Sequence, residues 1–169
     1  MTGMWQVLAL VSSLVIVPEA RRSSPSTRPL IADSVSCAEA AGFARVTQGM
    51  TARVDPDTID DWRTGRRLRG CRVTAAGSTR LGVAGEAVRF YERLRAAGWR
   101  RTPDPRDAPN EASLRFRWAV TDCVFNVYAD ARLGTDAEFA VNDSIPARAG
   151  EARYQLLVLC MPALPAAPR

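Results

Sequence analysis

The four cysteines, Cys37, Cys71, Cys123 and Cys160, are the residues whose covalent chemistry can be argued most directly from this sequence. They are widely spaced and include no CxxC pair, so a redox-active CxxC motif is absent. A four-thiolate zinc site normally brings its ligands in closely spaced pairs, and this sequence has none. We therefore predict two structural disulfides and no metal site.

Four cysteines allow three different pairings. We favour Cys37 with Cys71 and Cys123 with Cys160, because the last two fall in strands that we expect to lie near each other. Each bridge would close a loop of about 35 residues, which stabilises a fold by about 3–4 kcal/mol on the chain-entropy estimate. Such bonds persist in oxidising compartments, so the pattern points to an exported protein.

An apolar run from Met4 to Val17 supports export. It is too short for a comfortable membrane-spanning helix of about 20 residues, but it fits the apolar part of a signal peptide. The segment before it has no Lys or Arg, and Pro18 stands where a small residue is usual before cleavage after Ala20. We predict a cleaved signal peptide over 1–20, with an uncleaved anchor through 4–17 as the alternative.

The side chains that are missing restrict the possible chemistry. The chain has no His, and its 23 basic residues are all Arg. It therefore lacks an imidazole base, a His metal ligand and a Schiff-base amine. Arginine in place of lysine is typical of GC-rich coding, which indicates a bacterial source. Carboxylates remain the best available catalysts, and Glu111, Asp122 and Asp130 are the acids to consider for a hydrolase of wall sugars.

A basic segment is the strongest candidate for a binding surface. Its five arginines are Arg63, Arg66, Arg67, Arg69 and Arg72, and Arg100 and Arg101 add to the charge. On a strand, Arg67 and Arg69 would share the face of Cys71, whereas Arg66 and Arg72 would point the other way. The pleat thus divides the cluster. A surface for an anionic envelope component and a solvated strand face are both compatible with this pattern.

Two other patterns are weaker. The stretch Gly77–Gly85 has the strand, glycine loop and helix order of phosphate-binding loops, but Val83 and Ala84 stand where Lys and Ser or Thr are needed. Asp55, Asp57, Asp60 and Asp61 offer oxygen ligands for calcium, without the Gly and the terminal Glu of a calcium loop. We interpret the first as an ordinary connection and the second as a turn-rich acidic stretch.

The sequence predicts two helices, one from apolar periodicity and one from a capping pattern. The clearer one covers Val83–Ala97, with its stripe of Val83, Ala87, Phe90, Tyr91 and Leu94 facing the core and Gly98 ending it. A shorter helix is expected over Ser36–Phe43, with Ser36 as its cap and Gly42 as its end.

Alternation of apolar and polar residues predicts the strands. Arg66–Ala76 is one, and Leu114–Val120 and Cys123–Tyr128 form a hairpin that turns near 119–122. Glu138–Val141 could add a short edge strand. Tyr154–Cys160 is apolar on both faces, so we place it centrally in the sheet.

Together these elements predict an α+β fold with an antiparallel sheet of about four or five strands and one main helix on one face. We expect a signal peptide over 1–20, a flexible linker over 21–35, a single domain over 36–161 and a disordered tail over 162–169. The function that fits best is a periplasmic or extracellular, non-enzymatic accessory module, with a wall-sugar hydrolase or a membrane-anchored structural domain as alternatives. No cofactor and no nucleic acid are expected; the partner would be an anionic envelope component or another exported protein.

Overall fold

The computed structural model describes residues 34–102, 113–131 and 133–164. Within them, six strands form one antiparallel sheet and three α-helices lie against it. The class is α+β, as predicted, with more strands and helices than expected. The strands are β1 (Thr51–Asp61), β2 (Arg66–Thr79), β3 (Arg100–Arg101), β4 (Ser113–Trp118), β5 (Thr121–Tyr128) and β6 (Ala152–Pro162). The helices are α1 (Ser34–Gly42), α2 (Gly82–Ala96) and α3 (Asp136–Asp143).

The strands run in the order β1-β2-β6-β5-β4-β3, and every neighbouring pair is antiparallel. Strand β6 lies between β2 and β5, which confirms the central place expected for Tyr154–Cys160. Its residues Leu156 and Val158 are fully buried. Strand β6 therefore joins the β1–β2 hairpin to the β4–β5 hairpin, so that the described strands form one continuous hydrogen-bonded sheet.

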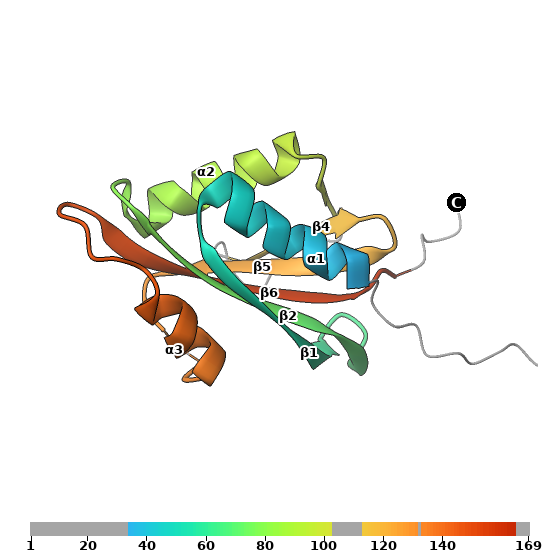
Figure 1. Cartoon of the computed structure of the whole chain (residues 1–169). Helices are drawn as coiled ribbons and strands as arrows, with labels where there is room; N and C mark the ends of the chain where they lie inside the picture. Colours follow the sequence, from blue (N-terminus) through green and yellow to red (C-terminus); the bar gives the residue numbers. More distant parts are fainter. Residues whose placement is uncertain (1–33, 103–112, 132, 165–169) are drawn as a thin grey trace, which may run out of the picture.

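Helices α1 and α2 cover one face of the sheet and α3 lies on the other (Figure 1). The main core fills the space under α1 and α2, and rings such as Phe90 and Phe125 interlock there, with centroids 5.9 Å apart. On the opposite face, α3 buries Val141 and Ile145 against Ala76 of β2. A second small cluster on that face contains Val124 and Met161, with Ile59 of β1 packed against them.

Helix α2 confirms the prediction made from its apolar stripe. Phe90 and Leu94 have no exposed surface and Tyr91 is 9% exposed, while Val83 and Ala87 pack at the margin of the core. Gly98 adopts φ +95° after the helix, and the Trp99 amide donates to the Leu94 carbonyl at 3.1 Å. This left-handed ending turns the chain from α2 into β3 and places the Trp99 ring under the helix.

The first helix begins earlier and continues further than the sequence indicated. Ser36 is not its cap, because α1 starts at Ser34, and Ser36 is buried inside the helix. Gly42 does not end it either: its φ of −60° is helical, and the chain continues as a π-helical segment, η1 (Phe43–Thr47). Ala40 and Ala44 are fully buried, and these small side chains allow the helix to lie close to the sheet.

The acidic stretch Asp55–Trp62 was wrongly interpreted as turn-rich, because most of it belongs to strand β1. Carboxylates face arginines across the β1–β2 ladder: Asp55 opposes Arg72, and Asp60 opposes Arg67. Opposite charges at directly paired positions stabilise a ladder. Pro56 is tolerated because β1 is at the edge of the sheet formed by the described residues, where an amide is not needed on the open side.

The expected strand over Glu138–Val141 is also wrong, since these residues lie in α3. Thr135 caps the helix by accepting the Glu138 amide at 3.2 Å. The Glu138 carboxylate, which is fully buried, accepts the amides of Leu133 and Gly134 at 2.9 Å each. A Thr-x-x-Glu capping pattern is a helix-start signal that outweighs four residues of weak alternation.

The predicted hairpin is present, with β4 and β5 joined through Ala119 and Val120. Ala119 adopts a positive φ of 50°, which allows the tight turn and explains the change of phase after Asp122. Phe116 and Cys123 face each other across the hairpin. The hairpin thus brings Cys123 to the centre of the buried face.

Both predicted disulfides are formed, Cys37–Cys71 between α1 and β2 and Cys123–Cys160 between β5 and β6. The predicted signal peptide, linker and most of the tail lie outside the described residues. Within the described ranges, no helix is long and apolar enough to cross a membrane.

Candidate functional site

A groove of about 730 Å³ lies between α2 and the β3–β4 edge of the sheet. Ligand sites commonly have volumes of roughly 300–1,000 Å³, so the groove has the size of a small-molecule site. We call it the α2 groove. Its lining consists of Val88, Tyr91, Glu92, Arg95, Trp99, Arg100, Arg101, Leu114 and Phe116.

The floor of the α2 groove is aromatic and held in place by the core. The rings of Tyr91 and Phe116 stack with their centroids 5.9 Å apart, and Trp99 meets Phe125 edge to face at 5.2 Å. The Tyr91 hydroxyl donates to the Phe125 carbonyl at 3.0 Å. Burial raises the pKa of Tyr91 well above its ordinary value, so this phenol stays neutral. A floor fixed in this way is preorganised, which lowers the entropic cost of binding.

The rim of the α2 groove is basic. Arg95 comes from the last turn of α2, and Arg100 and Arg101 form β3; all three are exposed. Glu92 is the one carboxylate in the described lining. Among described residues, no ion pair engages Arg95 or Arg100. The groove therefore combines an apolar floor with cationic donors at its edge, which suits a ligand with an apolar body and an acidic group.

A smaller hollow of about 310 Å³ lies on the other side of Trp99. Phe43 and Val46 of the α1–η1 segment line it together with Trp118 of β4. Val46 is 87% exposed, and the Trp118 ring lies 5.4 Å from that of Trp99. Because Trp99 lines both hollows, the apolar surface continues past it from α2 toward η1.

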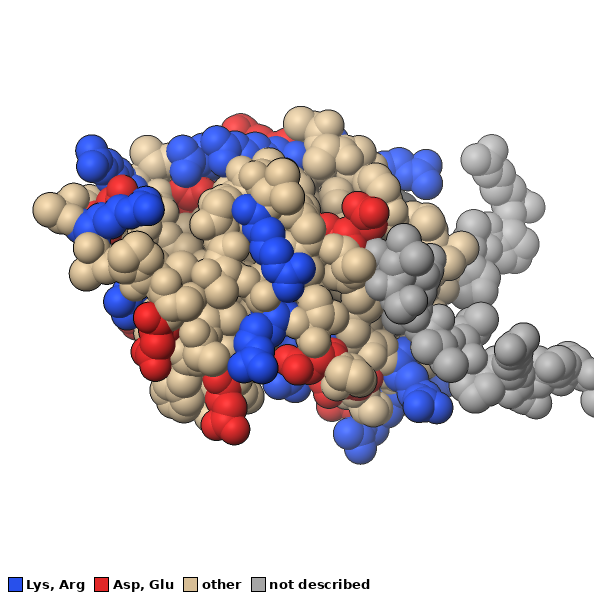
Figure 2. All heavy atoms as spheres, viewed as in Figure 1, with Lys and Arg blue, Asp and Glu red and all other residues tan. Residues whose placement is uncertain are grey.

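The predicted arginine cluster is dispersed by the fold. The Arg63 side chain is 2% exposed and held by Asp61 and Asp122, and Arg72 donates to Asp57 at 2.6 Å. Arg67 pairs with Asp60 at 3.2 Å, and Arg66 and Arg69 are exposed on opposite faces of β2. Figure 2 shows acidic side chains interspersed among the basic ones on the viewed surface. This segment offers no single dense cationic patch.

Sequence reasoning missed a buried ion network on the sheet face opposite α1 and α2. Its members are Asp61, Arg63, Arg115, Arg117 and Asp122. Arg115 has no exposed surface and donates to Asp61 at 3.4 Å, although β1 and β4 are separated by three strands in the sheet order. The tip of the β1–β2 hairpin therefore curls across that face and is fastened there by charge.

Within this network, Asp122 of β5 is the carboxylate that binds both Arg63 and Arg117. Arg117 donates to it at 2.6 and 3.0 Å, and Arg63 donates at 3.3 Å. The hydrogen bond to Asp122 raises the pKa of Arg117 above its ordinary value. The exposed Trp62 ring lies 6.0 Å from the Arg115 guanidinium and covers the network. This cation–π contact further stabilises the position of the β1–β2 hairpin tip on the sheet.

The acids proposed for hydrolysis are not assembled in a cleft. Asp122 is fully buried and bound by two guanidinium groups, and Asp130 is exposed after β5. Glu111 lies outside the described residues. The Gly77–Gly85 stretch runs from the end of β2 to the start of α2.

The other acidic candidates occupy a shallow hollow of about 330 Å³ at the β1 edge. Asp55, Asp57 and Asp136 line it with Arg53 and Arg72, and Asp57 is already paired with Arg72. No group of three His, Cys, Asp or Glu ligands for a metal forms among the described carboxylates. The hollow is therefore an ion-paired surface feature.

Of the groove residues, the sequence marks Arg100 and Arg101 only as an addition to the Arg63–Arg72 charge. It favours a core position over a ligand-stacking role for the aromatic residues Tyr91, Trp99 and Phe116. The chain matches no protein-family model, no curated protein and no solved structure at a significant level.

Proposed function

We propose that this chain is an exported, non-enzymatic accessory module that binds an anionic amphiphile in the α2 groove. The observation that supports this most directly is the combination of an aromatic floor and a basic rim in one groove of about 730 Å³. The exposed Val88 and the half-buried Leu114 offer apolar surface for a hydrocarbon chain, over the closely packed rings of Tyr91, Trp99 and Phe116. Arg95 and Arg100 offer guanidinium donors for a phosphate or carboxylate head.

Burial of the hydrocarbon chain and charge pairing of the head group are expected to contribute differently to binding. Each buried methylene group gains about 0.8 kcal/mol on transfer from water, so the chain supplies most of the affinity. An exposed charge pair contributes roughly 0.2–1 kcal/mol, so the arginines select the head group more than they add affinity. We therefore expect selectivity for anionic over zwitterionic heads of equal chain length, and a clear dependence on salt.

Export is part of the proposal and rests on the cysteines. All four are paired in two disulfides, which is the usual state of cysteines in oxidising compartments. The apolar run Met4–Val17 is the segment that would direct export. The intact mass of protein from the envelope fraction tests this. Loss of about 20 residues supports a cleaved signal peptide, whereas full-length protein in the membrane fraction would replace it with the anchored alternative.

The binding test is calorimetric titration with monododecyl phosphate below its micelle concentration. Dodecylphosphocholine, with the same chain and a zwitterionic head, serves as the comparison ligand. Arg100→Glu should weaken binding of the phosphate by at least about fivefold, because it removes one favourable charge and adds a repulsive one. The same change should leave dodecylphosphocholine binding nearly unaltered.

A matched pair of variants on α2 tests the location. Val88 is 61% exposed and lines the α2 groove, whereas Ala84, one turn earlier, is exposed and is not among its lining residues. Val88→Glu should abolish most of the binding and Ala84→Glu should not, although both add the same charge to an exposed position of one helix. Equal effects of the two changes, or no binding of monododecyl phosphate by the unaltered chain, would reject the proposal.

A further inference from the structure

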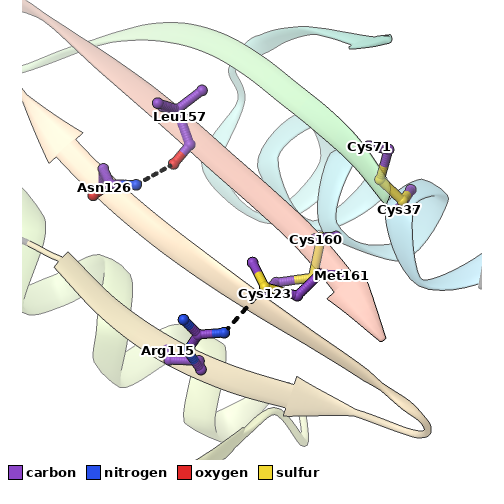
Figure 3. The surroundings of a disulfide bond; sticks show 8 residues. All are labelled: Cys37, Cys71, Arg115, Cys123, Asn126, Leu157, Cys160 and Met161. Carbon is purple, nitrogen blue, oxygen red and sulfur yellow. Dashed lines mark hydrogen bonds between the residues drawn. A yellow bond between two sulfur atoms is a disulfide. The ribbon is translucent and has the colours of Figure 1, made fainter. Parts of the chain in front are cut away.

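The two disulfides lie next to each other under α1 (Figure 3). Three of the four cysteines occupy one row across neighbouring strands. Cys160 of β6 is directly opposite Cys71 of β2 on one side and directly opposite Cys123 of β5 on the other. The Sγ atoms of Cys37, Cys71 and Cys160 all lie within 4.8 Å of one another.

This row gives Cys160 two geometrically suitable partners. Directly opposed residues on antiparallel strands have Cα atoms about 4.5–5.5 Å apart, which falls inside the range that a disulfide spans. Cys71 and Cys123 are on strands separated by β6, so their Cα atoms are about twice the strand spacing of roughly 4.8 Å apart and exceed that range. The three-strand row thus permits Cys71–Cys160 and excludes Cys71–Cys123.

We propose that the four cysteines form a thiol–disulfide exchange site, in which Cys160 transfers between Cys123 and Cys71. The co-reactant is a thiol, either a small molecule or the thiol of another exported protein. Its thiolate attacks Cys37 Sγ, the Cys37–Cys71 bond breaks, and Cys71 leaves as a thiolate. Cys71 Sγ then attacks Cys160 Sγ, the Cys123–Cys160 bond breaks, and Cys123 leaves as a thiolate.

The exchange is balanced in atoms and electrons. Two disulfides and one thiolate enter, and two disulfides and one thiolate leave: the mixed disulfide on Cys37, the new Cys71–Cys160 bond and the Cys123 thiolate. The order of events follows from burial. Cys71 is 7% and Cys37 3% exposed, whereas Cys123 and Cys160 have no exposed surface. An external thiol therefore reaches the outer bond first. Of the two sulfur atoms of that bond, attack on Cys37 is the one that releases Cys71 as the thiolate, and Cys71 then changes the inner bond.

Peptide mapping can follow every pairing, because trypsin places the four cysteines in four different peptides. These end at Arg45, at Arg72, at Arg132 and at the C-terminus. The folded protein is incubated with reduced glutathione, free thiols are trapped with N-ethylmaleimide, and linked peptides are identified by mass spectrometry. We expect a linkage between the Cys71 and Cys160 peptides together with alkylated Cys123.

Two variants that remove the same bridge provide the control. In Cys123→Ser, Cys160 loses its partner and should capture Cys71, leaving Cys37 as the free thiol in part of the molecules. In Cys160→Ser, Cys123 is free but cannot reach Cys71, so only Cys37–Cys71 should be found. After equilibration in a glutathione redox buffer, retention of Cys37–Cys71 alone in both variants would overturn the proposal. So would a Cys71–Cys123 linkage in Cys160→Ser. Neither result depends on ligand binding in the α2 groove.

Discussion

Removing the Asp122 carboxylate is the sharpest test of the buried ion network. Asp122 has no exposed surface and accepts from two guanidinium groups, Arg117 at 2.6 and 3.0 Å and Arg63 at 3.3 Å. In Asp122→Ala these positive charges lose their shared, fully buried partner. Breaking one side of a buried ion pair typically costs about 3–5 kcal/mol of folding free energy.

The structure places the expected cost near the lower end of that range. Arg63 keeps its contact with Asp61 at 3.1 Å, and the Arg117 side chain is 29% exposed and can turn toward water. We therefore expect a loss of about 3 kcal/mol. Asp60→Ala is the matched control, because Asp60 is also paired with an arginine, but both side chains are more than 70% exposed. Its effect should be close to zero, as for surface ion pairs generally.

Urea unfolding at neutral pH, followed by circular dichroism, measures both variants. With a slope of about 1–3 kcal/mol per molar urea, a loss of about 3 kcal/mol moves the midpoint of Asp122→Ala down by roughly 1–3 M. The midpoint of Asp60→Ala should stay within error of the unaltered chain. Similar midpoints for the two variants would show that the network does not stabilise the curled hairpin, and the reasoning would be refuted.

The remaining predictions concern the core, the titration of tyrosines and the bridges. Leu94→Ala should cost about 2–5 kcal/mol of folding free energy in the same unfolding assay, because Leu94 is fully buried. Arg93→Ala should cost little, because the hydrogen bonds of Arg93 lie at the margin of α2. Equal losses from the two changes would mean that α2 packs differently. Burial raises the pKa of Tyr91 and Tyr154, so folded stability is retained below the ordinary phenol pKa of about 10 and falls as pH rises past it. Phenolate absorbance of these two rings should appear only with unfolding, and reversible titration of Tyr91 or Tyr154 in the folded chain near pH 10 would contradict it. Reduction of both disulfides should lower the melting temperature. Thiol labelling of the denatured, unreduced protein should detect no free cysteine. Any labelled thiol in freshly isolated material would count against full pairing.

The parts of the fold that the sequence predicted well are those where one local signal dominates. The apolar stripe and the terminal Gly98 define α2, and strict alternation defines the β4–β5 hairpin. The expected proximity of two strands was enough to pair Cys123 with Cys160. For α2 and the hairpin the signal lies within about fifteen residues, which is the range over which periodicity is informative. The Cys123–Cys160 pairing spans 37 residues and followed from the placement of the two strands.

The failures arise where distant parts of the chain supply the stabilisation. Asp55–Asp61 has weak strand character of its own and becomes β1 through its ladder with β2 and the burial of Ile59 and Asp61. Arg115 alternates with core residues as a solvated side chain would, yet the hairpin tip carrying Asp61 folds over it. The α2 groove depends on the angle at which Trp99 and β3 leave the helix, which no local pattern encodes.

The central claim is that the α2 groove binds an anionic amphiphile, and the indole resonances of the chain test it most directly. Trp99 lines the groove, whereas Trp62 lies on the opposite side of the sheet, beside Arg115. A proton–nitrogen correlation spectrum is recorded during titration with monododecyl phosphate, and the indole signals are assigned by single Trp→Phe substitutions. We predict a saturable shift of the Trp99 indole signal and almost none at Trp62. An unmoved Trp99 signal at saturating ligand, or shifts of equal size at both indoles, would contradict the account.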